Sequence, residues 1–448
     1  MRSLLFYLMI LFSFSVPVAS MNIPQKYSIS YFSAKNGIED GLVNDMIQDR
    51  KGLLWFATWS GLYRFDGYNF KHYRSTGTDN ESLGNNRLLS IQEDNCGYLW
   101  ISSYDSVTYR FHPDKEFFEP VAPPDLSGSI YEIKVLPTGA VWIFYAEGRC
   151  VRITTNPRDH SLEFYEPDWD RSVRGKSVFA DPEDKEWILT NKGLYVFSGS
   201  TPSLVIPTSG PADEEIAFHA IAENQDELIA GADSGRIFRY SRTHSSVTYT
   251  QLPTSASVVS IQKLREEWVY VTDRDGIYTD SGREIRHLDL PPLNGSADTQ
   301  VVSAQTTENG LLWLTHACPG VTWYNPSTGK LKYVSGKDEN NHPLHTDTGF
   351  FAFTDIHGVL WVHPQGGGLS YYDPENDSLV PFNATEQTVK WKSNDRCFSA
   401  FSDKQGNLWL STQLNRLRRV SFLSDKFQIH TPTPRTRISR RMRYARFI

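Results

Sequence analysis

The sequence is poor in the residue patterns that mark enzymes and metal proteins. It contains only four cysteines, and no two of them stand in a CxxC spacing, which argues against a zinc site or a dithiol redox site. The HExxH, GxSxG, Walker and GxGxxG patterns are also missing. We therefore expect no catalytic residue, no metal and no cofactor, and mostly free or buried thiols.

Long apolar runs are missing as well, except at the start of the chain. Residues 4–18 are apolar, Arg2 precedes them, and small residues follow at 18–20. This order is typical of a secretory signal peptide, so we expect residues 1–20 to be removed on export to the periplasm. A membrane anchor is the alternative, although about 15 apolar residues are few for a span. No other segment approaches a span, so none is expected after cleavage.

Acidic residues outnumber basic ones over the chain, and the excess is larger when the last few residues are left out. The formal net charge is −7, although the end of the chain at 431–448 is rich in arginine and fits no strand or turn rule. A mildly acidic body argues against nucleic acid as a partner. An exported chain makes a nucleic-acid role for the arginine-rich tail less plausible still.

What the sequence does contain is a repeat. Nine copies of one short pattern recur at gaps of 40–48 residues. The mean gap of roughly 44 residues is the length of one four-stranded propeller blade. The copies are anchored by Trp55, Trp100, Trp142, Trp187, Leu228, Trp268, Trp313, Trp361 and Trp409.

Each copy combines a turn with two buried strands. In the clearest copy Asp49 precedes Gly52 by three positions, and an apolar run around Trp55 follows. An Asp at a turn bonds its own backbone, while Gly accepts positive φ. A second glycine, Gly61, then starts the next strand. The Trp is expected to pack between blades, and the recurring acids are expected to be structural.

Some copies lose part of this pattern. The third copy has no acidic residue in its turn, where Leu136 stands. The fifth copy has Leu228 in place of Trp, and the sixth has Arg265-Glu266-Glu267 with no turn glycine. We expect irregular blades there, because the spacing survives while the turn chemistry does not.

The repeat resembles the two-component regulator propeller repeat. The resemblance covers residues 24–434, and its most specific part is the block at 48–70, with Asp49, Gly52, Trp55 and Gly61. That block closely resembles the first blade of the periplasmic sensor region of Bacteroides-type hybrid two-component systems. The resemblance implies a sensor that detects oligosaccharides from complex glycans and forms a homodimer.

The resemblance also implies parts that this sequence does not show. Members of the family carry two consecutive seven-bladed propellers, a β-sandwich, a transmembrane helix, a histidine kinase, a receiver and an AraC-type DNA-binding domain. No kinase, receiver or helix-turn-helix pattern is present here. We interpret the chain as a sensor region truncated before its kinase half.

The fold class predicted is therefore all-β, a β-propeller of four-stranded blades. Seven repeats would close a first propeller over residues 21–335, and repeats eight and nine at 336–430 would begin a second, incomplete one. The acidic loop at 335–341 is the expected boundary. A single eight-bladed ring is the alternative, and a nine-bladed ring or an open arc is a further one.

Ligands of propellers usually meet loops at one face of the ring. Here we expect the loops between the second and third strands, together with the inter-blade loops, to bind an oligosaccharide, because aromatic rings stack on sugars and polar side chains bond hydroxyl groups. The alternative functions are a propeller hydrolase or lyase acting on polysaccharide and a protein-interaction scaffold. The candidate binding residues are Trp59, Tyr104, Tyr145, Asn191, Arg274, His316, Gln365 and Gln413.

Overall fold

The computed structural model describes most of the chain between residues 27 and 422. Residues 1–26 and 423–448 lie outside the described part, and so do 40–41, 76–81, 122, 124–127, 171, 199–200, 208–215, 225, 294–299, 319, 335–350, 356–357, 364–369, 382–396 and 413–415. The predicted signal peptide, boundary loop and arginine-rich tail therefore fall outside the described residues. Within the described part, no helix has the length and apolar character that a membrane crossing requires.

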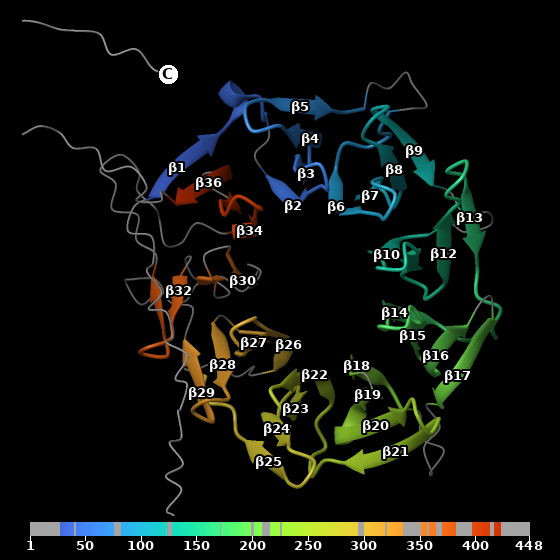
Figure 1. Cartoon of the computed structure of the whole chain (residues 1–448), viewed down its shortest axis with the longest axis vertical. Helices are drawn as coiled ribbons and strands as arrows, with labels where there is room; N and C mark the ends of the chain where they lie inside the picture. Colours follow the sequence, from blue (N-terminus) through green and yellow to red (C-terminus); the bar gives the residue numbers. More distant parts are fainter. Residues whose placement is uncertain are drawn as a thin grey trace, which may run out of the picture.

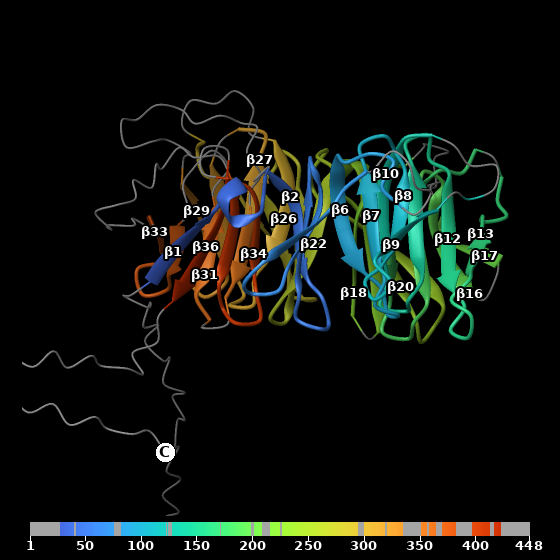
Figure 2. The ribbon, with the colours of Figure 1, turned by 90° about the horizontal axis from the view of Figure 1, so that it is seen from above.

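The described residues form nine four-stranded antiparallel sheets arranged around one central channel (Figure 1). Seen edge-on, the sheets stand side by side in a single flat ring (Figure 2). We number these blades one to nine in chain order. In blades one to eight the first strand in sequence lies nearest the channel and the fourth lies at the rim (Figure 1). The prediction of an all-β propeller with four-stranded blades is thus confirmed.

Blades one to five contain strands β2 to β21. Blade one contains β2 (Val43–Gln48), β3 (Leu54–Thr58), β4 (Gly61–Phe65) and β5 (Phe70–Tyr73). Blade two contains β6 (Leu88–Glu93), β7 (Leu99–Ser103), β8 (Thr108–His112) and β9 (Phe117–Val121). Blade three contains β10 (Ile130–Val135), β11 (Val141–Tyr145), β12 (Cys150–Thr155) and β13 (Leu162–Tyr165). Blade four contains β14 (Gly175–Ala180), β15 (Glu186–Thr190), β16 (Gly193–Ser198) and β17 (Thr201–Pro207). Blade five contains β18 (Phe218–Glu223), β19 (Glu227–Ala232), β20 (Arg236–Ser241) and β21 (Ser246–Gln251).

The last four blades complete the ring. Blade six contains β22 (Val258–Leu264), β23 (Glu267–Thr272), β24 (Ile277–Asp280) and β25 (Ile285–Leu288). Blade seven contains β26 (Val301–Thr306), β27 (Leu312–His316), β28 (Val321–Asn325) and β29 (Lys330–Val334). Blade eight contains β30 (Phe351–Thr354), β31 (Leu360–His363), β32 (Ser370–Asp373) and β33 (Ser378–Pro381). Blade nine contains β34 (Cys397–Ser402), β35 (Leu408–Thr412), β36 (Arg416–Phe422) and β1 (Tyr27–Phe32). Two short 3₁₀ helices lie outside these strands: η1 (Ala34–Asn36) follows β1, and η2 (Asp233–Gly235) lies between β19 and β20.

The predicted division into a seven-bladed propeller and two blades of a second one is wrong. Strand β1 does not complete blade seven, because it pairs antiparallel with β36 and forms the outer strand of blade nine. Blade nine in turn packs on blade one: Trp409 and Leu417 share an apolar cluster with Phe56. The Val43 N–H also donates to Ser411 Oγ at 2.9 Å. The ends of the described chain therefore close a single nine-bladed ring.

The nine anchor residues lie on the second strand of their blades, as the repeat predicted, and all are buried. Trp55 packs against Leu88 and Phe111 of the next blade, so the predicted inter-blade position is confirmed there. Burying a ring of this size removes about 150–250 Å² from water, or roughly 4–6 kcal/mol by area. The Trp side chains are therefore a main source of cohesion between blades.

A buried indole N–H needs an acceptor, and in five blades the turn aspartate supplies it. One carboxylate oxygen accepts backbone N–H groups of the turn, as Asp94 Oδ1 does from Cys96 and Tyr98. The other oxygen accepts the indole N–H of the Trp six residues later. These bonds measure 2.7–2.9 Å and join Trp55 to Asp49, Trp100 to Asp94, Trp187 to Asp181, Trp361 to Asp355 and Trp409 to Asp403.

In the other Trp-containing repeats, a different side chain accepts the hydrogen bond from the indole N–H. Trp142, whose own turn has no acid, donates to Glu186 of blade four at 2.8 Å. Trp268 donates to Glu227 of blade five at 3.1 Å, and Trp313 donates to Thr307 at 3.3 Å. In the glycine-free turn of blade six, Arg265 itself adopts a positive φ of 54°. Each indole N–H in these blades therefore has an acceptor, although the turn sequence differs.

We expect Asp94→Ala to lower the free energy of unfolding by about 3 kcal/mol, because it leaves the Trp100 indole and two turn N–H groups without acceptors. Urea unfolding measures the change. Adding Trp100→Phe should cost less in the Asp94→Ala background than in the parent chain, because the unpaired donor is then gone. The exposed Asp114→Ala is the matched control, and a loss of equal size there would refute the explanation.

Closure through β1 predicts a specific cross-link. Ser28 faces Ser421 in the β1–β36 register, so Ser28→Cys with Ser421→Cys should form a disulfide under mild oxidation, in a chain with Cys96 replaced by Ser. Peptide mapping by mass spectrometry identifies the bond. The control pair, Ser28→Cys with Lys330→Cys on β29, should stay reduced. A disulfide in the control pair and none in the test pair would show that β1 belongs to blade seven.

Candidate ligand-binding site

One face of the ring carries a repeated backbone irregularity. In eight of the nine blades the innermost strand has a register shift after its first residue. Such a bulge re-aims the extra side chain and is common beside binding sites. The side chains at the shifts are Asn44, Leu89, Tyr131, Lys176, His219, Val259, Val302 and Phe398.

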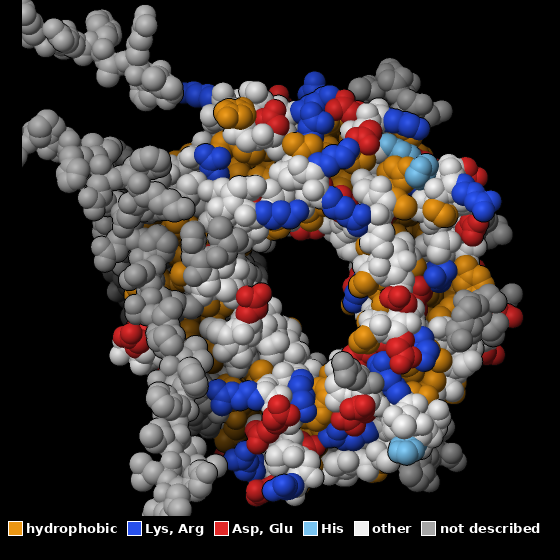
Figure 3. All heavy atoms as spheres, viewed as in Figure 1, with side chains coloured by type: hydrophobic (Ala, Val, Ile, Leu, Met, Phe, Trp, Pro, Cys, Tyr) orange, Lys and Arg blue, Asp and Glu red, His pale blue; other side chains and the backbone are white. Residues whose placement is uncertain are grey.

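These bulges lie at the mouth of the central channel, which is open in the space-filling view (Figure 3). Because neighbouring strands run antiparallel, the start of each first strand lies beside the end of the second strand. The loops between second and third strands therefore lie next to the bulges. Leu89, Tyr131, Val302 and Phe398 are exposed although they are apolar.

At this mouth, blades one and two bring two exposed rings together. Trp59 lies in the β3–β4 turn and is 46% exposed, and Tyr104 lies in the β7–β8 turn and is 60% exposed. Their ring centroids are 6.5 Å apart, with 41° between the ring planes. The Arg87 guanidinium carbon lies 5.4 Å from the Trp59 ring centroid and 5.7 Å from that of Tyr104. We call Trp59, Tyr104, Arg87 and Asn44 the aromatic platform.

Hydrogen bonds fix the platform to the blades. The Trp59 indole N–H donates to Asn44 Oδ1 at 3.1 Å, and the Asn44 side-chain amide donates to the Leu88 carbonyl of blade two at 2.6 Å. The Tyr104 backbone N–H donates to the Arg87 carbonyl at 2.8 Å. The bulge residue Asn44 thus links both blades to the exposed indole.

The turn that carries Trp59 is closed by its neighbours. Thr58 Oγ1 accepts the Ser60 N–H at 3.0 Å and donates to the Gly61 carbonyl at 2.7 Å. Gly61 has a φ of +126°, and a Cβ there would lie 2.4 Å from the Tyr73 carbonyl oxygen. Only glycine fits this position, so the second glycine of the repeat is what allows the tight turn.

A carboxyl group lies directly behind the platform. Asp45 follows the bulge, and its two oxygens accept the backbone N–H groups of Met46 and of Ile91 in blade two, both at 2.9 Å. Burial raises the pKa of Asp45, and these two hydrogen bonds oppose the rise. This acid therefore serves to join blades one and two beneath the platform.

The other predicted site residues do not join the platform. Tyr145 and His316 are buried, and the His316 ring bonds Thr322 Oγ1 at 2.7 Å. Asn191 holds its loop by bonds to the Ser172 carbonyl and the Arg174 N–H. Arg274 is exposed and lies 3.6 Å from Asp273. Gln365 and Gln413 lie outside the described residues.

Two platform residues, Arg87 and Asn44, were not among the sequence-based candidates. Arg87 directly precedes a first strand and Asn44 lies near the start of one, whereas all the candidate residues stand at or just after the ends of second strands. The detectable signal was positional: Asn44 is the second residue of its inner strand, the position at which seven other blades also have a bulge. Arg87 stands immediately before the equivalent strand of blade two.

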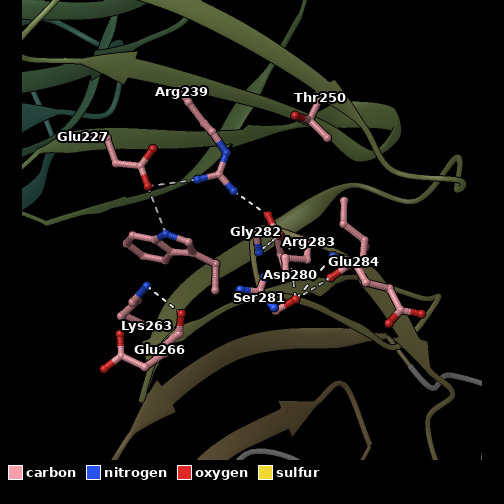
Figure 4. Close-up of a pocket in the computed structure, with 12 residues that line it drawn as sticks. Glu227, Arg239, Thr250, Lys263, Glu266, Asp280, Ser281, Gly282, Arg283 and Glu284 are labelled. Atoms are coloured by element: carbon pink, nitrogen blue, oxygen red, sulfur yellow. Dashed lines mark hydrogen bonds and ion pairs between the residues drawn. The ribbon is translucent and has the colours of Figure 1, made fainter.

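Away from the platform, a hollow of about 570 Å³ opens between blades five and six (Figure 4). Arg239 crosses it and donates to Glu227 Oε1 at 3.0 Å and to Asp280 Oδ2 at 2.5 Å. It also donates to the Tyr270 hydroxyl, and burial raises the pKa of that phenol. Glu227 is the acceptor of the Trp268 indole. The charged groups at the base of this hollow are thus bonded to one another, which indicates a structural role.

No metal site was found in the described part of the chain: no three His, Cys, Asp or Glu side chains there are grouped to hold an ion. Cys96, Cys150 and Cys318 are free thiols, and burial raises the pKa of Cys150.

Comparison with known proteins places the repeat in a family. Residues 82–105 match the two component regulator propeller family. This segment covers β6, β7 and the beginning of the loop that carries Tyr104, and it includes Arg87. The chain therefore carries a two-component regulator propeller repeat, and the resemblance inferred from the sequence is confirmed.

Three individual proteins are similar over parts or most of the chain. A histidine kinase, P4 of Formosa agariphila, is 34% identical over 84 residues, which are 18% of this chain and 6% of the kinase. The extracellular domain of a hybrid two component system from B. thetaiotaomicron is 15% identical with a TM-score of 0.36, and the match covers 88% of this chain and 58% of that domain. Virginiamycin B lyase from Staphylococcus aureus is 12% identical with a TM-score of 0.41, covering 89% of this chain and all of the lyase.

These similarities cover only part of the sensor domain and of the kinase. The chain spans less than two thirds of the sensor domain and a small part of the kinase.

The hollow between blades five and six provides a stability test. Arg239→Met should lower the free energy of unfolding by about 3 kcal/mol, because Glu227 and Asp280 would lose their common cation while partly buried. Chemical denaturation measures the loss. Arg283→Met, at the exposed edge of the same hollow, is the control and should change stability by less than about 0.5 kcal/mol. Equal effects of the two variants would contradict the structural role.

Proposed function

We propose that this chain is an exported, non-enzymatic ligand-sensing module of a two-component regulatory system, and that it recognises oligosaccharides. The family of the repeat supports the sensing role. The aromatic platform is the observation that supports the ligand class, because it joins two exposed rings to amide and guanidinium donors at the channel mouth.

The platform suits a sugar for physical reasons. A pyranose presents C–H groups on its faces and hydroxyl groups at its edge, so it binds best where a ring can stack and polar groups can reach the edge. Trp59 and Tyr104 offer such ring faces, and their exposure means that little must move before a ligand binds. Asn44 holds the Trp59 ring in place, which lowers the entropy lost on binding.

The repeated acids do not support glycoside hydrolysis. That chemistry requires two carboxyl groups facing one sugar-sized space. The turn aspartates Asp49 and Asp94 are buried and bonded to indole and backbone N–H groups. These acids lie in the turns between first and second strands, at the opposite end of the blades from the platform.

Isothermal titration against a panel of neutral and charged oligosaccharides tests the proposal. At least one should bind, and Trp59→Ala and Tyr104→Ala should each weaken its Kd at least about tenfold, equivalent to about 1.4 kcal/mol. Tyr68→Ala is the matched control, because Tyr68 is 90% exposed and lies in a turn on the other face. Product analysis after long incubation should show an unchanged oligosaccharide.

Three results would contradict the proposal. No binding by folded protein would remove the oligosaccharide as ligand. Binding that neither Trp59→Ala nor Tyr104→Ala weakens would remove the platform as the site. Cleavage of the oligosaccharide would indicate that the chain is a propeller hydrolase or lyase.

A further inference from the structure

The aromatic platform contains a cation that the fold itself does not use. We propose that Arg87 selects sugars that carry an anionic group, either a carboxylate or a sulfate, and that the two rings hold its guanidinium ready for that group. This inference rests on the proposed function, because it assigns a substrate class to the same site.

The bonding of Arg87 differs from that of the arginines inside the blades. Arg110, Arg152 and Arg239 each pair with a carboxylate at 2.5–3.0 Å. The Arg87 side chain is exposed, and within the described part of the chain it has contacts with two rings and no carboxylate within ion-pair distance. Its charge is therefore not neutralised by the described part of the fold.

The two acids that directly follow platform residues in the sequence, Asp45 and Asp105, are already bonded elsewhere. Asp45 is half-buried and accepts the N–H groups of Met46 and Ile91. Asp105 accepts a hydrogen bond from Ser103 Oγ at 2.5 Å, which closes the turn that carries Tyr104. Both carboxylates therefore serve the backbone and turns of blades one and two.

Two aromatic faces are well suited to hold such a cation. A guanidinium within about 6 Å of a ring centroid is attracted by the ring quadrupole, and this attraction leaves its N–H donors available. Arginine presents those donors in a planar fork that matches a carboxylate or sulfate with two parallel bonds. Because the rings restrict Arg87 before binding, less side-chain entropy is lost when the anion arrives.

The geometry predicts which part of the ligand each platform residue contacts. A sugar ring lies against Trp59 or Tyr104, and its acidic substituent meets the guanidinium between them. Neutral sugars keep the stacking contact and hydroxyl hydrogen bonds but lack the ion pair with Arg87. The preference for charged sugars should therefore depend on Arg87, whereas binding of any sugar should depend on the rings.

The test uses a glycan array that carries neutral, uronate-containing and sulfated oligosaccharides built on the same backbones, followed by calorimetry on the best-bound backbone. The parent protein should bind an anionic member at least about tenfold more tightly than its neutral counterpart. Arg87→Gln should abolish that preference, because it weakens binding of the anionic member at least about tenfold more than binding of the neutral member. Arg87→Lys should keep part of it, because lysine retains the charge but not the fork. The uronate and sulfate arms show which anion is preferred.

Two controls separate the possible failures. Arg158→Gln removes an exposed arginine in the turn between β12 and β13, and it should leave the preference unchanged. Circular dichroism and urea unfolding confirm that each variant is folded, and Arg87→Lys serves if Arg87→Gln is not. If no oligosaccharide binds at all, the proposed function is wrong. If neutral members bind as tightly as anionic ones, or if Arg87→Gln keeps the preference, the proposed function stands and this inference is overturned.

Discussion

The structure depends on giving an acceptor to each buried indole N–H. A tryptophan on the second strand is large enough to fill the space between two blades, but its N–H cannot be left unpaired in an apolar interior. An aspartate in the preceding turn meets this need and also accepts the turn's own N–H groups, as Asp94 does. One carboxylate therefore fixes the shape of the turn, the rotamer of the tryptophan and the contact with the next blade. Where the aspartate is lost, Glu186 and Glu227 accept the bond from a neighbouring blade, so the constraint is kept although the sequence pattern is not.

Ring closure arranges the blades around one channel and creates the surface that carries the aromatic platform. Strand β1 supplies the fourth strand of blade nine, and the innermost strands then surround one channel. The bulge after the first residue of those strands turns a side chain out of the regular ladder at the channel mouth. Blades one and two use this position to connect Asn44, Trp59 and the carbonyl of Leu88. The rigid blades thus hold two exposed rings on short turns, an arrangement suited to recognition by loops on a stable scaffold.

The sequence alone predicts the blade correctly and the ring incorrectly. The repeat gives the strand order, the Trp positions and the turn chemistry because these depend on residues within about ten positions of one another. The number of blades in the ring depends instead on pairs such as Phe32 with Leu417, which no local pattern encodes.

Two of the four residues of the aromatic platform, which is a proposed site, were named from the sequence for a related reason. Trp59 and Tyr104 were found because they occupy the same loop position in successive repeats, while Tyr145 and His316, chosen by the same rule, are buried. Arg87 was missed because it follows an inter-blade loop of variable length, where repeat alignment gives no guidance.

The claim on which the rest depends is that blades one to nine form one ring. Cryo-electron microscopy of the purified chain, viewed along the channel, counts the blades directly. The structure predicts a single closed ring of nine blades with β1 at the rim of blade nine. A closed ring of seven blades with two further blades outside it would contradict that claim and would move β1 away from β36.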